Sequence, residues 1–120
     1  MKIFIDPGHG GNNPGAIGPN GLQEADVNLD IGLKLGRILS SWGYEVNYSR
    51  TTDKTVTLGK RARLANEWGA NYFVSIHCNS NVNPEANGTS TYFYRPGIVA
   101  ESFAITVNNS LVRQIELQDL

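Results

Sequence analysis

The sequence predicts an α/β protein whose mostly parallel, mixed sheet is flanked by helices. Two observations predict this fold class. Short apolar runs alternate along the chain with longer segments whose apolar residues recur at helical spacing. Polar loops rich in glycine or asparagine separate these segments. At 120 residues the chain is long enough for one domain with its own core.

Composition and charge exclude several classes of protein. The chain is 40% hydrophobic and 18% charged, as is ordinary for a globular protein. A net charge of −1 without a basic run argues against a nucleic-acid partner. The single cysteine, Cys78, excludes an internal disulfide framework and a multi-cysteine zinc site. We expect no membrane span, because no apolar stretch approaches roughly 20 residues, and no signal peptide, because the N-terminus leads directly into a strand.

The first part of the chain predicts a strand followed by a helix. Three consecutive apolar residues within 2–6 suit a strand that is buried on both faces. A polar loop leads from there into a helix over about 23–41, whose apolar stripe we expect to face the sheet. Glu24 begins that stripe, where a carboxylate is costly to bury unless it has a partner. The stripe comprises Val27, Ile31, Leu35, Ile38 and Trp42.

The rest of the chain continues the same alternation. The run that ends at His77 is the most apolar, so we expect it at the centre of the sheet. Threonine or serine alternating with aromatic residues predicts one more strand before the last helix. No repeat or linker interrupts the chain, so one domain over 1–120 is expected. The predicted elements are strands at 44–49, 72–77 and 89–94 and helices at 57–68 and 97–113.

Both histidines of the chain stand at ends of predicted strands. His9 follows the first strand, His77 ends the third, and Glu24 lies in the first turn of the helix that starts from the same edge. Ligands of parallel α/β sheets bind beyond the carboxyl ends of the strands, so we expect these three residues in one crevice. Two imidazoles and one carboxylate suit a catalytic zinc ion, since three protein ligands leave the fourth position open for water.

Each of these residues also has a plainer interpretation. A histidine at a strand end often caps a loop, and an acid in the first helical turn is favoured by the helix dipole. The coincidence of all three at one edge favours the metal. Asp6 either orients a ligand histidine or caps the turn, and Asn79 either binds substrate or forms a turn; both alternatives stay open.

Cys78, Arg50 and Arg61 are expected to have structural roles. Neighbours in a strand face opposite ways, so Cys78 points away from a metal held by His77 and packs in the core. The two arginines are each able to bind a carboxylate of a ligand, but solvated or structural ion pairs are the expectation.

Motifs spread over nearly the whole chain resemble one family, the zinc-dependent N-acetylmuramoyl-L-alanine amidases of the amidase_3 type. The similarity is greatest to signal-less members from bacilli and phages, including mother-cell lytic amidases. The matching motifs are Asp6-Pro7-Gly8-His9-Gly10-Gly11, Gly15-Ala16, Gly21-Leu22-Gln23-Glu24, Ser49-Arg50 with Asp53, Leu58 with Arg61 and Ala65-Asn66, Val74-Ser75-Ile76-His77-Cys78-Asn79, and Gly88-Thr89.

The resemblance implies zinc (Zn2+) held by His9, Glu24 and His77, and peptidoglycan as the partner. The implied reaction is hydrolysis of the amide between the lactyl group of N-acetylmuramic acid and L-alanine by zinc-activated water. The implied place of action is the bacterial cell wall. Without a signal peptide, synthesis in the cytoplasm and release by lysis or another route is expected.

The family's general-base glutamate belongs to a motif near the C-terminus that has no counterpart up to Leu120. We therefore expect an amidase domain whose C-terminal strands and helix are absent. Glu85, Glu101 and Glu116 remain as candidates, none of them in a matching context. The alternative is a catalytically impaired zinc-holding or wall-binding fragment, and a different zinc hydrolase is a third possibility. An open sheet edge would allow self-association.

Overall fold

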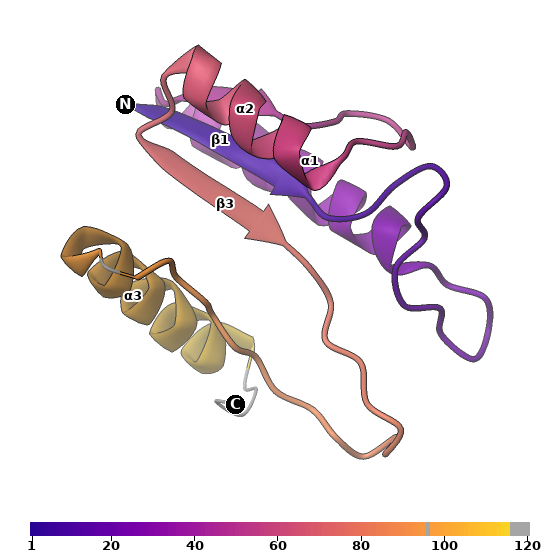
Figure 1. The fold of residues 1–120 in the computed structure, drawn as a ribbon. Coiled ribbons are helices and arrows are strands. Elements are labelled where there is room, and N and C mark those ends of the chain that lie inside the picture. The colour runs from indigo at the N-terminus through magenta and orange to yellow at the C-terminus, as the bar shows by residue number, and fades with distance from the viewer. Residues whose placement is uncertain (96, 116–120) are drawn as a thin grey trace. The chain divides into compact units, whose positions relative to one another are not determined.

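The computed structural model of the protein describes residues 1–95 and 97–115. The chain divides into two compact units, Met1–Cys78 and Asn79–Leu120. Within these described residues, the first unit contains the sheet and two helices, and the second contains one helix. In Figure 1 the first unit runs from indigo to rose and the second from orange to yellow.

Three parallel strands form the sheet of the first unit, in the order β2-β1-β3. They are β1 (Lys2–Pro7), β2 (Glu45–Tyr48) and β3 (Tyr72–Ile76). β1 is buried along nearly its whole length, as its apolar run predicts. The prediction of a central position for the strand ending near His77 is wrong, because β1 lies between the other two. Side chains of β3 alternate between half-buried and exposed, so its apolar composition does not reflect burial on both faces.

A helix covers each face of this sheet. In Figure 1, α2 (Leu58–Trp68) lies in front of the strands and α1 (Glu24–Ser41) behind them. The side chains of β1 alternate accordingly. Phe4 packs against Trp68 of α2, with ring centroids 6.2 Å apart, whereas Pro7 faces Gly32 of α1 on the other side. The α/β fold with a parallel sheet flanked by helices is thereby confirmed.

The buried face of α1 is not the apolar stripe that the sequence predicts. Ile31, Ile38 and Trp42 are exposed. A Cβ atom at Gly32 would lie only 2.8 Å from Cγ of Pro7, so the helix approaches the sheet more closely than a larger side chain allows. Close packing therefore selects small and polar residues for this face. These are Glu24, Ala25, Asn28, Gly32 and Gly36.

The second unit contains α3 (Ile98–Ile115), which confirms the predicted last helix. The predicted strand over 89–94 is wrong, because no strand forms there and only Thr89 has a bridge-type pairing. A strand forms only where its backbone N–H and C=O groups pair with those of a neighbouring strand. An alternating pattern of side chains does not by itself provide such a partner. The Thr91 hydroxyl instead donates to the Asn108 side chain of α3 at 3.1 Å. None of the helices in the described ranges is both long and apolar enough to cross a membrane.

Candidate metal centre

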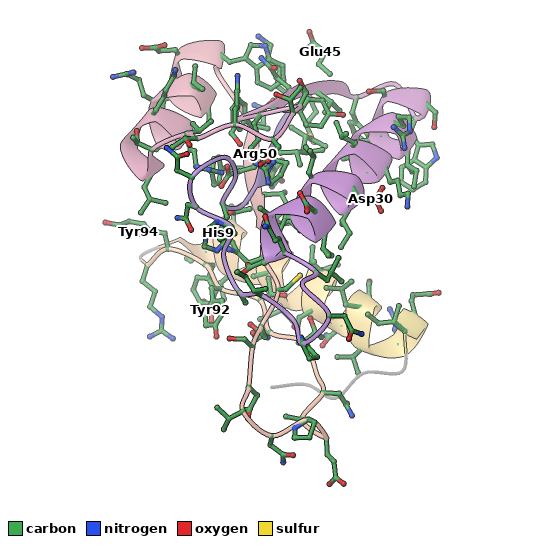
Figure 2. All side chains as sticks on the ribbon, turned by 90° about the vertical axis from the view of Figure 1, so that its right-hand side faces the viewer. His9, Asp30, Glu45, Arg50, Tyr92 and Tyr94 are labelled. Atoms are coloured by element: carbon green, nitrogen blue, oxygen red, sulfur yellow. The ribbon has the colours of Figure 1, made fainter. Side chains whose placement is uncertain are left out.

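Three potential metal ligands converge at the carboxyl end of the sheet. His9 follows β1, Glu24 is the first residue of α1, and His77 directly follows β3. One ligand atom from each residue lies within 4.8 Å of the other two, and within 1–95 and 97–115 this group contains no further member. The structure thus brings together the three residues that sequence reasoning singled out. Figure 2 shows His9 next to the first turn of α1.

The Glu24 carboxylate lies between the two imidazoles. Its Oε2 is 3.3 Å from Nε2 of His9, and its Oε1 is 3.1 Å from Nδ1 of His77. The two rings meet edge to face, with centroids 4.9 Å apart. Each histidine therefore presents one nitrogen to the same carboxylate, and the three ligand atoms surround one point.

Hydrogen bonds keep the buried carboxylate charged. Burial alone would raise the pKa of Glu24, but hydrogen bonds outweigh it and lower the pKa to about 2. The backbone N–H groups of Ala16 and Cys78 donate at 3.0 and 2.9 Å, and the side chains of Asn28 and His77 add to the effect. Glu24 is thus ionised at neutral pH, as a metal ligand must be.

The backbone at His9 has an unusual conformation, with a φ of 61° in the left-handed region. Few residues other than glycine adopt it, so the surrounding structure must hold it in place. Arg61 Nη2 donates to the carbonyl of His9 at 2.7 Å. On the other side, Nδ1 of His9 lies 3.1 Å from Oδ1 of Asn13. His9 is therefore held through both its backbone and its ring.

Two buried arginines hold the loop that carries His9. Arg50 and Arg61 are 1% and 5% exposed, so the expectation of solvated side chains is wrong for both. Arg61 forms the structural ion pair that was the other expectation, with Asp6 at 2.8 Å. Its place one helical turn before Ala65, the other buried residue of α2, was the available signal for the burial of Arg61. The carbonyl groups bound by one or both arginines belong to Pro7, Gly8, His9, Ala25, Thr52 and Val56.

Asp6 is buried beneath the site without bonding to either histidine. Its carboxylate accepts hydrogen bonds from Ser49 at 2.6 Å and Ser75 at 2.7 Å, in addition to the ion pair with Arg61. Because Arg61 in turn holds the carbonyl of His9, Asp6 reaches the ligand loop through that arginine.

Asn28 contacts the candidate site through its side chain, and sequence reasoning missed it. Its Nδ2 donates to the carbonyl of Gly8 at 3.1 Å and to Glu24 Oε1 at 3.4 Å. Its Oδ1 accepts from the Cys78 thiol at 3.5 Å, so the thiol is turned toward α1 and is not part of the ligand group. The signal was available: an asparagine one turn after Glu24 on a helix lies on the same face as Glu24.

The other residues singled out from the sequence belong to the second unit. Asn79 begins the second unit and donates to Ser90 at 3.3 Å. Glu85 and Glu101 belong to the second unit as well. Glu116 lies outside the described residues.

The donor set fits a divalent cation. Two imidazole nitrogens and an ionised carboxylate face one point, which is the ligand combination of several catalytic zinc sites. Cysteine, the usual ligand of structural zinc sites, contributes only its backbone N–H here.

Comparison with known proteins gives a consistent result. The model of the Amidase_3 family, described as N-acetylmuramoyl-L-alanine amidase, matches residues 3–119. The sporulation-specific N-acetylmuramoyl-L-alanine amidase of Bacillus subtilis is 41% identical over 122 residues, which cover 99% of this chain and 46% of that protein. The amidase CwlM of Bacillus licheniformis is 39% identical over 123 residues, covering 99% and 47%.

Solved structures show the same similarity. The N-acetylmuramoyl-L-alanine amidase AmiC2 of Nostoc punctiforme superposes with a TM-score of 0.91 at 36% identity, covering 99% of this chain and 66% of that one. An N-acetylmuramoyl-L-alanine amidase from Clostridium difficile 630 gives 0.92 at 36% identity, covering 98% and 66%. The chain thus spans about half the length of the curated relatives it matches.

Proposed function

Because the chain belongs to the Amidase_3 family of N-acetylmuramoyl-L-alanine amidases, we propose that it acts on peptidoglycan at the bacterial cell wall. The proposed reaction is hydrolysis of the amide between the lactyl group of N-acetylmuramic acid and L-alanine. The observation that carries this proposal is the convergence of His9, Glu24 and His77 around one point.

Zinc is the metal that we propose for this point, held by the two histidines and Glu24. Three protein ligands leave a coordination position open, whereas structural zinc sites usually close all four. When bound, zinc supplies Lewis-acid polarisation of the substrate carbonyl and acidifies a water molecule to a pKa of about 7.

The residues of the chain prepare the site for this chemistry. Glu24 supplies a negative charge that partly balances a divalent cation, and its hydrogen bonds from Ala16 and Cys78 fix both carboxylate oxygens. We propose that Asp6 positions His9 through Arg61. Asn79, which directly follows Cys78 in the chain, is our candidate for contact with the substrate.

Two proposals concern larger parts of the chain. We propose that the two units belong to one catalytic domain, which is supported by the match of the family model to residues from both. We also propose that the sheet can self-associate through an outer edge, since β2 and β3 are its outer strands. Light scattering over a range of concentrations tests this, and a monomer at every concentration contradicts it.

Purified cell walls provide the direct test of the reaction. The zinc-loaded chain is incubated with walls, and new L-alanine amino ends and free lactyl groups are measured. Loss of a residue that only supports a metal ligand lowers activity by up to roughly 100-fold. Glu24→Ala removes a proposed ligand itself, so it should reduce the release of these products by more than that. Glu45→Ala is the matched control, because Glu45 is an exposed carboxylate on β2, and it should leave the release unchanged.

The products also separate the amidase from its rivals. Sedimentation with walls and no new amino ends would identify a wall-binding or zinc-holding fragment. Mass spectrometry of the released material identifies the bond that is broken. Products of a carboxypeptidase or a sugar deacetylase would overturn the proposed bond, even if zinc is required.

A further inference from the structure

We propose that Asn13 is a positioning residue that determines which nitrogen of His9 carries the hydrogen, and so turns the lone pair of Nε2 toward the metal position. The inference rests on the proposed metal site and deepens it. It concerns a side chain that lies outside the ligand group and whose oxygen contacts His9 and Gly15 rather than the Glu24 carboxylate.

Asn13 lies in a tight turn whose backbone is fixed independently of its side chain. The N–H of Gly10 donates to the carbonyl of Asn13 at 2.7 Å, and the N–H of Asn13 donates to the carbonyl of Gly10 at 3.1 Å. The side-chain oxygen Oδ1 then lies 3.1 Å from Nδ1 of His9 and 3.3 Å from the backbone nitrogen of Gly15. One amide oxygen therefore joins the ligand ring to the loop that leads to α1.

The contact with Gly15 identifies the atom that faces His9. A backbone N–H only donates, so the Asn13 side chain must present its oxygen, and not its NH₂ group, to Gly15. The same oxygen faces Nδ1 of His9, which must then carry the hydrogen. A neutral imidazole has one N–H, so Nε2 is left with a free lone pair.

That lone pair points at Glu24. Nε2 of His9 is 3.3 Å from Oε2 of Glu24, and two acceptors at this distance attract each other only through a shared cation. With the hydrogen on Nε2 instead, His9 would donate to Glu24 and lose the nitrogen that a metal needs. Asn13 thus favours the tautomer that binds metal over the one that Glu24 alone would select.

The turn is shaped to bring Asn13 this close. Gly15 has a φ of +70°, and a Cβ atom there would lie 2.6 Å from both Oε2 of Glu24 and Cδ2 of His9. Only glycine fits between the turn and the two ligands. The turn therefore passes in direct contact with the site that Asn13 serves.

Zinc affinity and the tautomer of His9 test the proposal, each measured on the full chain. Zinc dissociation constants come from competition with a chromophoric chelator. The tautomer comes from ¹⁵N NMR of the zinc-free protein, at a pH well above the ordinary imidazole pKa of about 6.5. The variants are Asn13→Ala, which removes the acceptor, and Asn13→Asp, which keeps one. Asn12→Ala is the control, because the adjacent Asn12 is exposed and donates to the Thr55 hydroxyl through its backbone N–H, which alanine keeps.

We expect Asn13→Ala to populate the Nε2–H tautomer and to weaken zinc binding about tenfold. This is the low end of the range for neighbours of metal ligands, since Asn13 is exposed to water. Asn13→Asp should keep hydrogen on Nδ1 and bind zinc at least as tightly as the wild type, and Asn12→Ala should match the wild type in both measurements.

Three outcomes would overturn the proposal. These are an unchanged tautomer in Asn13→Ala, unchanged zinc affinity in that variant, or loss of affinity in Asn13→Asp equal to that in Asn13→Ala. A wild type that does not bind zinc would refute the proposed function instead, and the tautomer measurement would still decide the role of Asn13.

Discussion

At the scale of single residues, the site depends on a buried carboxylate whose charge is stabilised before any metal arrives. Glu24 accepts hydrogen bonds on both oxygens, and its pKa is lowered to about 2 despite burial. Both histidines approach it within 3.3 Å. The energetic cost of burying this charge is thus offset within the protein, and the ligand geometry is largely formed in advance.

Glu24→Gln is the residue-scale prediction. The side chain keeps its shape, but its NH₂ group must face a backbone N–H of Ala16 or Cys78, which leaves a buried donor unsatisfied. We expect loss of stoichiometric zinc, measured by elemental analysis, and a loss of about 1–3 kcal/mol in the unfolding free energy of the zinc-free protein. Glu45→Gln, on the exposed side of β2, should change neither quantity. Equal zinc content in wild type and Glu24→Gln would remove Glu24 from the site.

At the scale of elements, α1 positions Glu24 by its close approach to the sheet. Gly32→Ala places a Cβ atom 2.8 Å from the rigid ring of Pro7, and such overpacking costs about 1–3 kcal/mol. Gly59→Ala in α2 has no atom within 4 Å of the new methyl group and should stabilise by up to about 1 kcal/mol through helix propensity. Urea unfolding should therefore show that Gly32→Ala lowers the unfolding free energy and that Gly59→Ala raises it. A stabilised Gly32→Ala variant would contradict the close packing of α1.

The buried face of α2 gives a second prediction at this scale. Arg61→Lys keeps a positive charge near Asp6 but cannot reach all the carbonyl groups that the guanidinium binds. We expect a loss of about 3 kcal/mol in unfolding free energy, at the lower end for a disrupted buried ion pair. Arg63→Lys is the control, since Arg63 is exposed and its ion pair with Glu67 spans 3.8 Å; it should stay within about 0.5 kcal/mol. Equal stability of the two variants would show that the carbonyl contacts of Arg61 contribute little.

At the scale of the whole molecule, all three proposed ligands come from the first unit although they are far apart in the sequence. A zinc ion would therefore connect β1, α1 and β3 within Met1–Cys78. At a zinc concentration of 100 times the dissociation constant, binding adds about 2.7 kcal/mol to stability, which raises the melting temperature by roughly 10 °C. Removal of zinc by a chelator should reverse the shift, and Glu24→Gln should abolish it.

Hydrogen exchange locates this stabilisation. We expect zinc to slow exchange of backbone amides within Met1–Cys78 and to leave those of α3 nearly unchanged, because all three proposed ligands belong to the first unit. Slower exchange along α3 on zinc binding would show that the two units respond to the metal as one.

The accuracy of the sequence predictions differs between kinds of feature. The boundaries of α1, α2 and β1 were predictable within a residue or two, because periodicity and glycine stops are local signals. The segment over 89–94 had the right alternation for a strand but does not form one. Burial of α1 through glycine and asparagine could not be predicted from hydrophobicity, because it depends on the shape of the sheet that the helix meets.

The sequence by itself determined the α/β fold class, the order of most elements and the candidate ligands His9, Glu24 and His77, since residue type, spacing and strand ends are all local properties of the chain. Only the tertiary structure decided that β1 is the central strand, that Arg50 and Arg61 hold the ligand loop, and that Asn13 meets the His9 ring. The physical reason is that each of these features depends on groups that folding brings together, such as neighbouring strands, backbone carbonyls or an imidazole ring. Such partners leave no pattern in the sequence.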